Sequence, residues 1–144
     1  MAAFKANIQG LGGTLKRIEQ YNKALATDVD AILTEGANNI SAQAKATVSK
    51  DTQALANSIG VDASVHNSKV VGTDLVYGAY LEFGTGEHVF DGPFNFTSEQ
   101  RDFAKEFFVS GKGRLHSRPY LFPALAAETP KILAKIRRLF FGDI

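Results

Sequence analysis

Residues 58–77 have the sequence SIGVDASVHNSKVVGTDLVY, and this stretch decides the predicted fold. Apolar residues alternate with polar ones from Val61 to His66, and Asn67 and Ser68 then favour a turn before a second run rich in β-branched residues. This pattern predicts a β-hairpin with one face toward the core and one face in water. The chain should therefore contain at least a small antiparallel sheet.

The sequence before this hairpin has helical periodicity. Apolar residues recur at spacings of three and four from Leu15 to Val48, and Thr14 is a suitable N-cap residue. The apolar stripe changes phase near Gly36. The predicted long helix therefore either bends there or projects and packs against another protomer.

A second long helix is predicted from Arg118-Pro119 toward the end of the chain. Its apolar stripe consists of Leu121, Leu125, Ile132, Ile136 and Phe140. Pro130 lies inside this pattern and predicts a kink or a break. The opposite stripe is basic and consists of Lys131, Lys135 and Arg138, which we call the basic stripe.

The basic stripe belongs to an asymmetric distribution of charge. Residues 1–108 carry 9 basic and 13 acidic side chains, whereas residues 109–144 carry 7 basic and 2 acidic ones. A charged helix face is most often simply solvated. The functional alternative is an electrostatic surface that lines a channel for DNA and contacts it weakly.

Residues 86–117 form the least regular stretch of the sequence. Thr97 and Gln100 fit a capping box that begins a helix of about ten residues. Six of the 11 phenylalanines lie in this stretch: Phe90, Phe94, Phe96, Phe103, Phe107 and Phe108. They either pack onto the core or form an apolar contact surface, and we expect a mobile insertion that uses them to recognise a neighbouring protein.

The sequence predicts a non-catalytic protein without cofactor or metal. Cysteine is absent, which excludes thiolate nucleophiles and Cys-ligated metal sites. His66, His88 and His116 lack the spacing of a metal site, and no nucleophile motif is present. No apolar run approaches the roughly 20 residues that span a bilayer, so we expect no membrane partner. The length predicts one domain, residues 1–144.

Three strings resemble a family of small morphogenesis proteins of tailed phages, described as head–tail joining, tail-completion or minor tail components. Residues 52–59, TQALANSI, resemble its T-G-A-L-R-x-S-I string, with Gln53 and Ala56 departing from the pattern. Residues 77–85, YGAYLEFGT, resemble Y-A-x-Y-x-E-F-G-T, and residues 118–125, RPYLFPAL, resemble R-P-F-L-x-P-A-L.

The motif residues carried over from this resemblance are Tyr77, Tyr80, Glu82, Phe83, Gly84, Thr85, Arg118, Pro119, Leu121 and Pro123. Most of them are expected to act in packing, with Gly84 supplying a left-handed backbone and the prolines marking a helix start. Glu82 and Arg118 are lone charges in apolar strings. We therefore expect them to form an ion pair.

The predicted elements give an α+β fold in which a long N-terminal helix and a C-terminal helix pack on the same face of a small, mainly antiparallel sheet. The resemblance implies a virion subunit at the head–tail neck, assembled in the host cytoplasm into a ring, expected to be a hexamer. The expected neighbours are head-completion and tail-tube or tail-terminator proteins, with DNA contacted at most weakly. The alternatives are a tail terminator that caps the tube and a DNA-contacting accessory protein.

Overall fold

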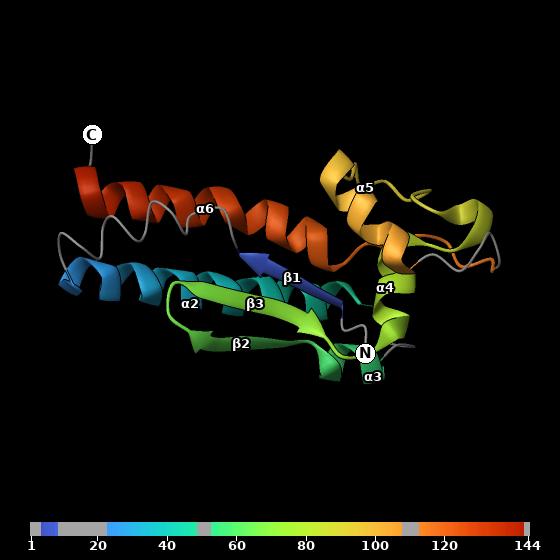
Figure 1. Cartoon of the computed structure of the whole chain (residues 1–144), viewed down its shortest axis with the longest axis horizontal. Helices are drawn as coiled ribbons and strands as arrows, with labels where there is room; N and C mark the ends of the chain where they lie inside the picture. The colour runs from blue at the N-terminus through green and yellow to red at the C-terminus, as the bar shows by residue number, and fades with distance from the viewer. Residues whose placement is uncertain (1–3, 9–22, 49–52, 108–112, 143–144) are drawn as a thin grey trace.

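The computed structural model describes residues 4–8, 23–48, 53–107 and 113–142. Its elements in chain order are β1 (Phe4–Ile8), α2 (Lys23–Thr47), α3 (Gln53–Ser58), β2 (Gly60–Val65), β3 (Ser68–Thr73), α4 (Val76–Phe83), η2 (Gly86–His88), α5 (Ser98–Ala104), η3 (Lys105–Phe107) and α6 (Leu121–Phe141). The predicted α+β class is confirmed (Figure 1). The candidate N-cap Thr14 lies outside the described residues.

The three described strands form one antiparallel sheet in the order β1-β3-β2. The predicted hairpin is confirmed, with Asn67 at a φ of 60° in the turn between β2 and β3. Strand β1 was not predicted, because Phe4–Ile8 lies just before a glycine-rich segment. It pairs along β3 from Phe4 opposite Thr73 to Ile8 opposite Lys69.

The expected alternation of buried and exposed residues holds in β3 and fails in β2. Lys69, Val71 and Thr73 of β3 are buried on one face, whereas Ala63 is exposed and Val65 is 59% exposed. β2 is an outer strand, and its register with β3 shifts between Asp62 and Val65. Such an irregularity interrupts the two-residue period and turns the strand away from the core.

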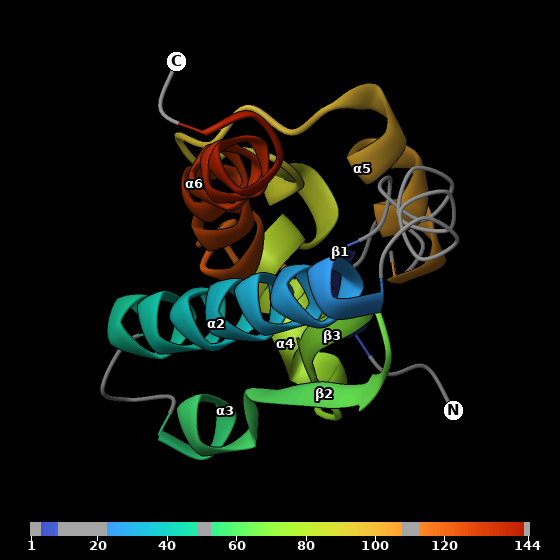
Figure 2. The same cartoon turned by 90° about the vertical axis from the view of Figure 1, so that its left-hand side faces the viewer.

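The two long helices run antiparallel and pack against each other (Figure 1). Figure 2 shows α2 between α6 and the strands β2 and β3, both of which α2 contacts, while α6 also contacts β1. Gly36 of α2 lies against Ile132 of α6, where a Cβ would collide with the isoleucine side chain. Gly36 thus permits close approach of the helices, and α2 continues through it.

A kink or a break was predicted at Pro130, and the break is wrong, because α6 continues through this residue. Pro130 is exposed, and so is Ala126, whose carbonyl loses its helical partner at a proline four residues later. Water can hydrate that carbonyl, so the helix does not have to end. Among the described residues, no helix combines the length and apolarity needed to cross a bilayer.

The phenylalanine-rich segment packs onto the core at the end where α6 begins. The ring of Phe83 from α4 lies 5.5 Å from that of Phe96, 6.4 Å from that of Phe107 and 5.7 Å from that of Phe122, measured between centroids. The capping box of α5 is confirmed, since Thr97 accepts from the Gln100 backbone and Gln100 accepts from the Thr97 backbone.

Candidate functional site

The two strongest motif strings meet at the N-terminus of α6. Glu82 of α4 is fully buried, and its carboxylate accepts hydrogen bonds from three consecutive backbone amides. Oε2 accepts from Tyr120 at 2.7 Å and from Leu121 at 3.0 Å, and Oε1 accepts from Phe122 at 2.8 Å. The next residue is Pro123, which has no amide hydrogen. One side chain thus satisfies the free donors of this helix start.

The predicted ion pair between Glu82 and Arg118 is wrong. The Arg118 side chain is exposed, and its backbone amide donates to the Leu81 carbonyl at 2.7 Å. The amides at a helix N-terminus carry partial positive charge and can hold a carboxylate without a guanidinium. Glu82 does have its partner in the third string, but that partner is the backbone of residues 120–122.

Burial has a strong effect on the titration of this junction. It raises the pKa of Glu82 to about 7, although the three amide donors oppose the rise. Burial and the nearby Glu82 charge also raise the pKa of Tyr120. The Tyr120 hydroxyl donates to the Gly78 carbonyl at 2.9 Å, and the Ser117 hydroxyl donates to the Glu82 carbonyl at 2.8 Å. These bonds hold α4 on the start of α6.

The other motif residues support the same junction. Phe83 and Leu121 are buried in the core, and Tyr80 and Pro119 are partly buried. Gly84 has a φ of 81°, in the region that was predicted for it, and a Cβ there would collide with the His88 carbonyl oxygen. The Thr85 hydroxyl oxygen accepts from the Leu115 amide at 2.9 Å.

Tyr77 differs from the other aromatic and aliphatic motif residues because 45% of it is exposed. Leu75 and Val76 immediately before it are also exposed, so three consecutive apolar residues form a surface at the start of α4. We call Leu75, Val76 and Tyr77 the α4 apolar surface. Packing within the described fold does not account for their apolar character.

The candidate interface phenylalanines are mostly occupied within the fold. Phe96 and Phe107 are buried, and Phe90, Phe94 and Phe103 are partly buried against the core. Phe108 lies outside the described residues. The five described rings therefore pack onto the core. The mobility of residues 86–117 and the role of the phenylalanines in recognising a partner stay predictions.

The basic stripe is exposed along α6, as predicted. Lys135 pairs with Glu35 of α2 at 2.9 Å, and Lys131 lies 3.8 Å from Glu128. Glu128 is buried and also accepts from Asn39 and Gln43 of α2. Part of the positive charge is thus neutralised between the helices, and the role of the stripe in a DNA channel stays a prediction.

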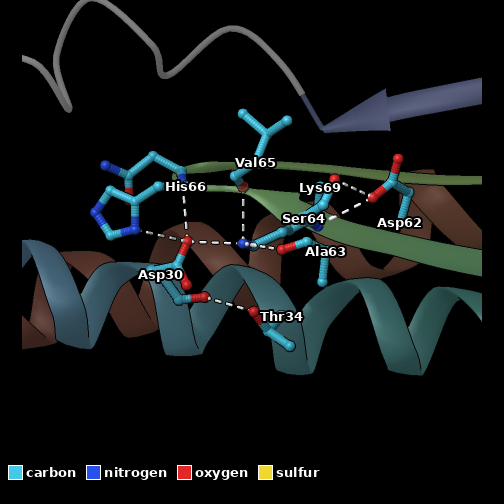
Figure 3. Close-up of polar contacts among 9 residues, drawn as sticks. Asp30, Thr34, Asp62, Ala63, Ser64, Val65, His66 and Lys69 are labelled. Carbon is cyan, nitrogen blue, oxygen red and sulfur yellow. Dashed lines mark hydrogen bonds and ion pairs between the residues drawn. The ribbon is translucent and has the colours of Figure 1, made fainter.

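A buried lysine fastens the tip of the hairpin to α2 (Figure 3). The side chain of Lys69 is 2% exposed, and its Nζ lies 2.8 Å from Asp30 while donating to the carbonyls of Ala63 and Val65 at 3.0 and 2.9 Å. Sequence analysis missed this contact, because a lysine within a strand pattern normally faces water. All three ammonium hydrogens have acceptors, so Lys69 is not a free nucleophile.

Asp30 joins this contact to the turn. Its Oδ1 accepts from the Asn67 amide at 2.8 Å and lies 3.3 Å from His66 Nδ1. Burial acts to raise the pKa of Asp30, but the bonds from Lys69 and Asn67 outweigh it and hold the pKa below its usual value. The arrangement is a structural clamp between α2 and the hairpin.

A surface pocket of about 230 Å³ lies beside the hairpin and the end of α3. Its lining includes the hydroxyls of Ser58 and Thr73 and the carboxylates of Asp62 and Asp74. Ser58 and Thr73 are hydrogen-bonded to each other at 2.5 Å.

Fold and surfaces together place the chain among small α+β proteins built from two long helices and a three-stranded sheet. Residues 13–84 match the HK97-gp10-like family, described as "Bacteriophage HK97-gp10, putative tail-component", and the chain belongs to this family. The predicted resemblance to phage tail components is therefore confirmed. The match includes the first string and all of the second except Thr85, and it ends at Gly84, before the string at residues 118–125. No curated protein and no solved structure matches the sequence.

Proposed function

We propose that this protein is a ring-forming subunit at the head–tail interface of a long-tailed phage, where it joins the tail to the head. Membership of a phage tail-component family supports a structural role in the virion. A hexameric ring is proposed because the tail tube on whose axis it would lie is six-fold. Its neighbours would be head-completion proteins on one side and tail-tube or tail-terminator proteins on the other.

The observation that carries this proposal is the α4 apolar surface. Tyr77 belongs to the string that resembles the phage family, yet it remains exposed together with Leu75 and Val76. Exposed neighbouring apolar residues are typical of contact sites. The three side chains are only partly exposed, so the surface is small. A small contact is consistent with a subunit that associates weakly alone and forms a ring on its assembly partner.

We also propose that the protein has no catalytic activity. The Ser58 and Thr73 hydroxyls of the pocket are hydrogen-bonded to each other. All three hydrogens of the buried Lys69 ammonium have acceptors. These arrangements stabilise the fold and leave no activated nucleophile in either place.

The test is complementation of a phage whose own copy of the gene is inactivated. Val76→Asp with Tyr77→Ser places polar groups on the α4 apolar surface, and the aspartate lies in the first turn of α4, where a negative charge is tolerated. The matched control is Phe141→Ser, which changes a 68% exposed aromatic residue near the end of α6.

We expect the double variant to fold normally but to leave free heads and free tails in electron micrographs of the lysate, whereas the control restores particles. Normal particle yield from the double variant would refute the role of this surface. Tails of uncontrolled length without the protein would instead identify a tail terminator.

A further inference from the structure

Two histidines and an aspartate that are distant in the sequence meet near the turn after η2. His88 belongs to η2, Asp91 follows three positions later, and His116 lies 25 positions beyond Asp91. The Nδ1 atom of His88 lies 2.9 Å from Asp91 Oδ2, and the Nδ1 atom of His116 lies 2.6 Å from the same oxygen. The two imidazole rings are in contact, with centroids 3.8 Å apart.

The backbone holds these three side chains in place. The Thr85 amide donates to the Leu115 carbonyl at 2.9 Å, and the His88 amide donates to the Thr85 carbonyl at 3.0 Å. The Ser117 amide donates to Asp91 Oδ1 at 2.8 Å, which fixes one carboxylate oxygen and directs the other toward the histidines. Residues on both sides of the phenylalanine-rich segment are thus joined before any ligand binds.

We propose that His88, Asp91 and His116 form a binding site for a divalent transition-metal ion, with Zn²⁺ as the best match. One ligand atom from each residue lies within 4.8 Å of the other two, which is the range that a single ion can bridge after small side-chain rotations. Two imidazole nitrogens and one carboxylate oxygen are typical ligands of Zn²⁺, and water completes a tetrahedral site. The Ser117 amide on the second carboxylate oxygen acts as the outer contact that orients a ligating carboxylate.

Convergence of two imidazoles on one carboxylate oxygen favours a metal over a purely structural hydrogen-bond cluster. A single hydrogen bond would suffice to place Asp91, and the Ser117 amide already provides one. An ion can reach these ligands from solvent, because the His116 side chain is 62% exposed. A bound ion would cross-link the two ends of the segment that carries α5 and stabilise its attachment to the start of α6.

The spacing of the histidines along the sequence matches no known metal motif, so no metal site was predicted. The fold nevertheless brings His116 back to Asp91 across the whole phenylalanine-rich segment. The three ligands can be predicted only once the hydrogen bond between Thr85 and Leu115 is known, because this bond brings the two ends of the segment together.

The test is a titration of the full-length protein with Zn²⁺ by calorimetry after treatment with a chelator, together with Co²⁺ absorption spectra. His116→Gln can keep a donor near Asp91 but removes the imidazole ligand. His66→Ala is the matched control, because His66 is 54% exposed and lies beside Asp30, away from this cluster.

We expect one ion per wild-type chain, visible-region Co²⁺ bands of a low-coordinate site, and a rise in thermal stability that the chelator reverses. His116→Gln should weaken Zn²⁺ binding by more than about tenfold, and His66→Ala should leave it unchanged. Equal Zn²⁺ affinity in His116→Gln and the wild type, or no Zn²⁺ binding by the wild type, would overturn the proposal.

Discussion

Replacing Glu82 by alanine tests the junction between α4 and α6. The variant leaves three backbone amides without their acceptor in a site where Glu82 is fully buried. Each unsatisfied buried amide costs about 1–3 kcal/mol, so the loss is about 6 kcal/mol. Alanine also removes the cost of keeping a buried carboxylate ionised at pH 8. That cost is about 3 kcal/mol, because burial raises the pKa from 4.5 to about 7 and one pKa unit corresponds to about 1.4 kcal/mol.

The expected net destabilisation at pH 8 is therefore about 3 kcal/mol, which for a chain of this size lowers Tm by roughly 10 °C. Thermal unfolding followed by circular dichroism measures it. Arg118→Ala is the control and should cost less than about 0.5 kcal/mol, because its side chain is exposed. The double variant should show no coupling. A loss below about 1 kcal/mol for Glu82→Ala, or a coupling above about 1 kcal/mol, would refute the backbone-acceptor account.

Three further predictions concern pH, the buried lysine and DNA. Because the pKa of Glu82 is raised from 4.5 to about 7 in the fold, the unfolded chain loses this proton first, and the free energy of unfolding should fall by about 2–3 kcal/mol from pH 5 to pH 8. This loss should be absent in Glu82→Gln, as denaturant titrations at both pH values will show. Lys69→Met should lower the free energy of unfolding by about 2–4 kcal/mol, because it removes the ammonium from Asp30 and from the Ala63 and Val65 carbonyls. Lys45→Met on the exposed side of α2 should change that free energy little. The basic stripe should bind duplex DNA more weakly than micromolar at physiological salt, and tighter binding with a steep salt dependence in an anisotropy titration would favour the DNA-contacting alternative.

Local sequence patterns were sufficient to predict the hairpin, both long helices and the capped helix α5. Each of these depends on residues within a few positions, such as the apolar spacing in α2 or Thr97 and Gln100 at the start of α5. Strand β1 could not be predicted in this way, because its pairing with β3 joins segments more than 60 positions apart. Propensity alone does not encode such a distant partner.

The contacts of Glu82 and Lys69 were harder to predict, because these side chains bind backbone groups or residues distant in the sequence. Glu82 was expected to need an opposite charge, but three amides of α6 take that role. Pro130 was expected to kink or break α6, but the helix does not end there, because Pro130 lies on the exposed side where its missing hydrogen bond costs little. Lys69 gave no signal, because nothing in its neighbours indicates that Asp30 lies beneath it.

The most direct test of the account is an electron cryomicroscopy map of the neck of the virion that carries this protein. We predict a ring of six copies on the tail axis between head and tail, with the antiparallel pair of α2 and α6 recognisable in each copy and the α4 apolar surface against the neighbouring copy. Density for this fold only at the tail tip or on the capsid shell, or its absence from the particle, would contradict the account.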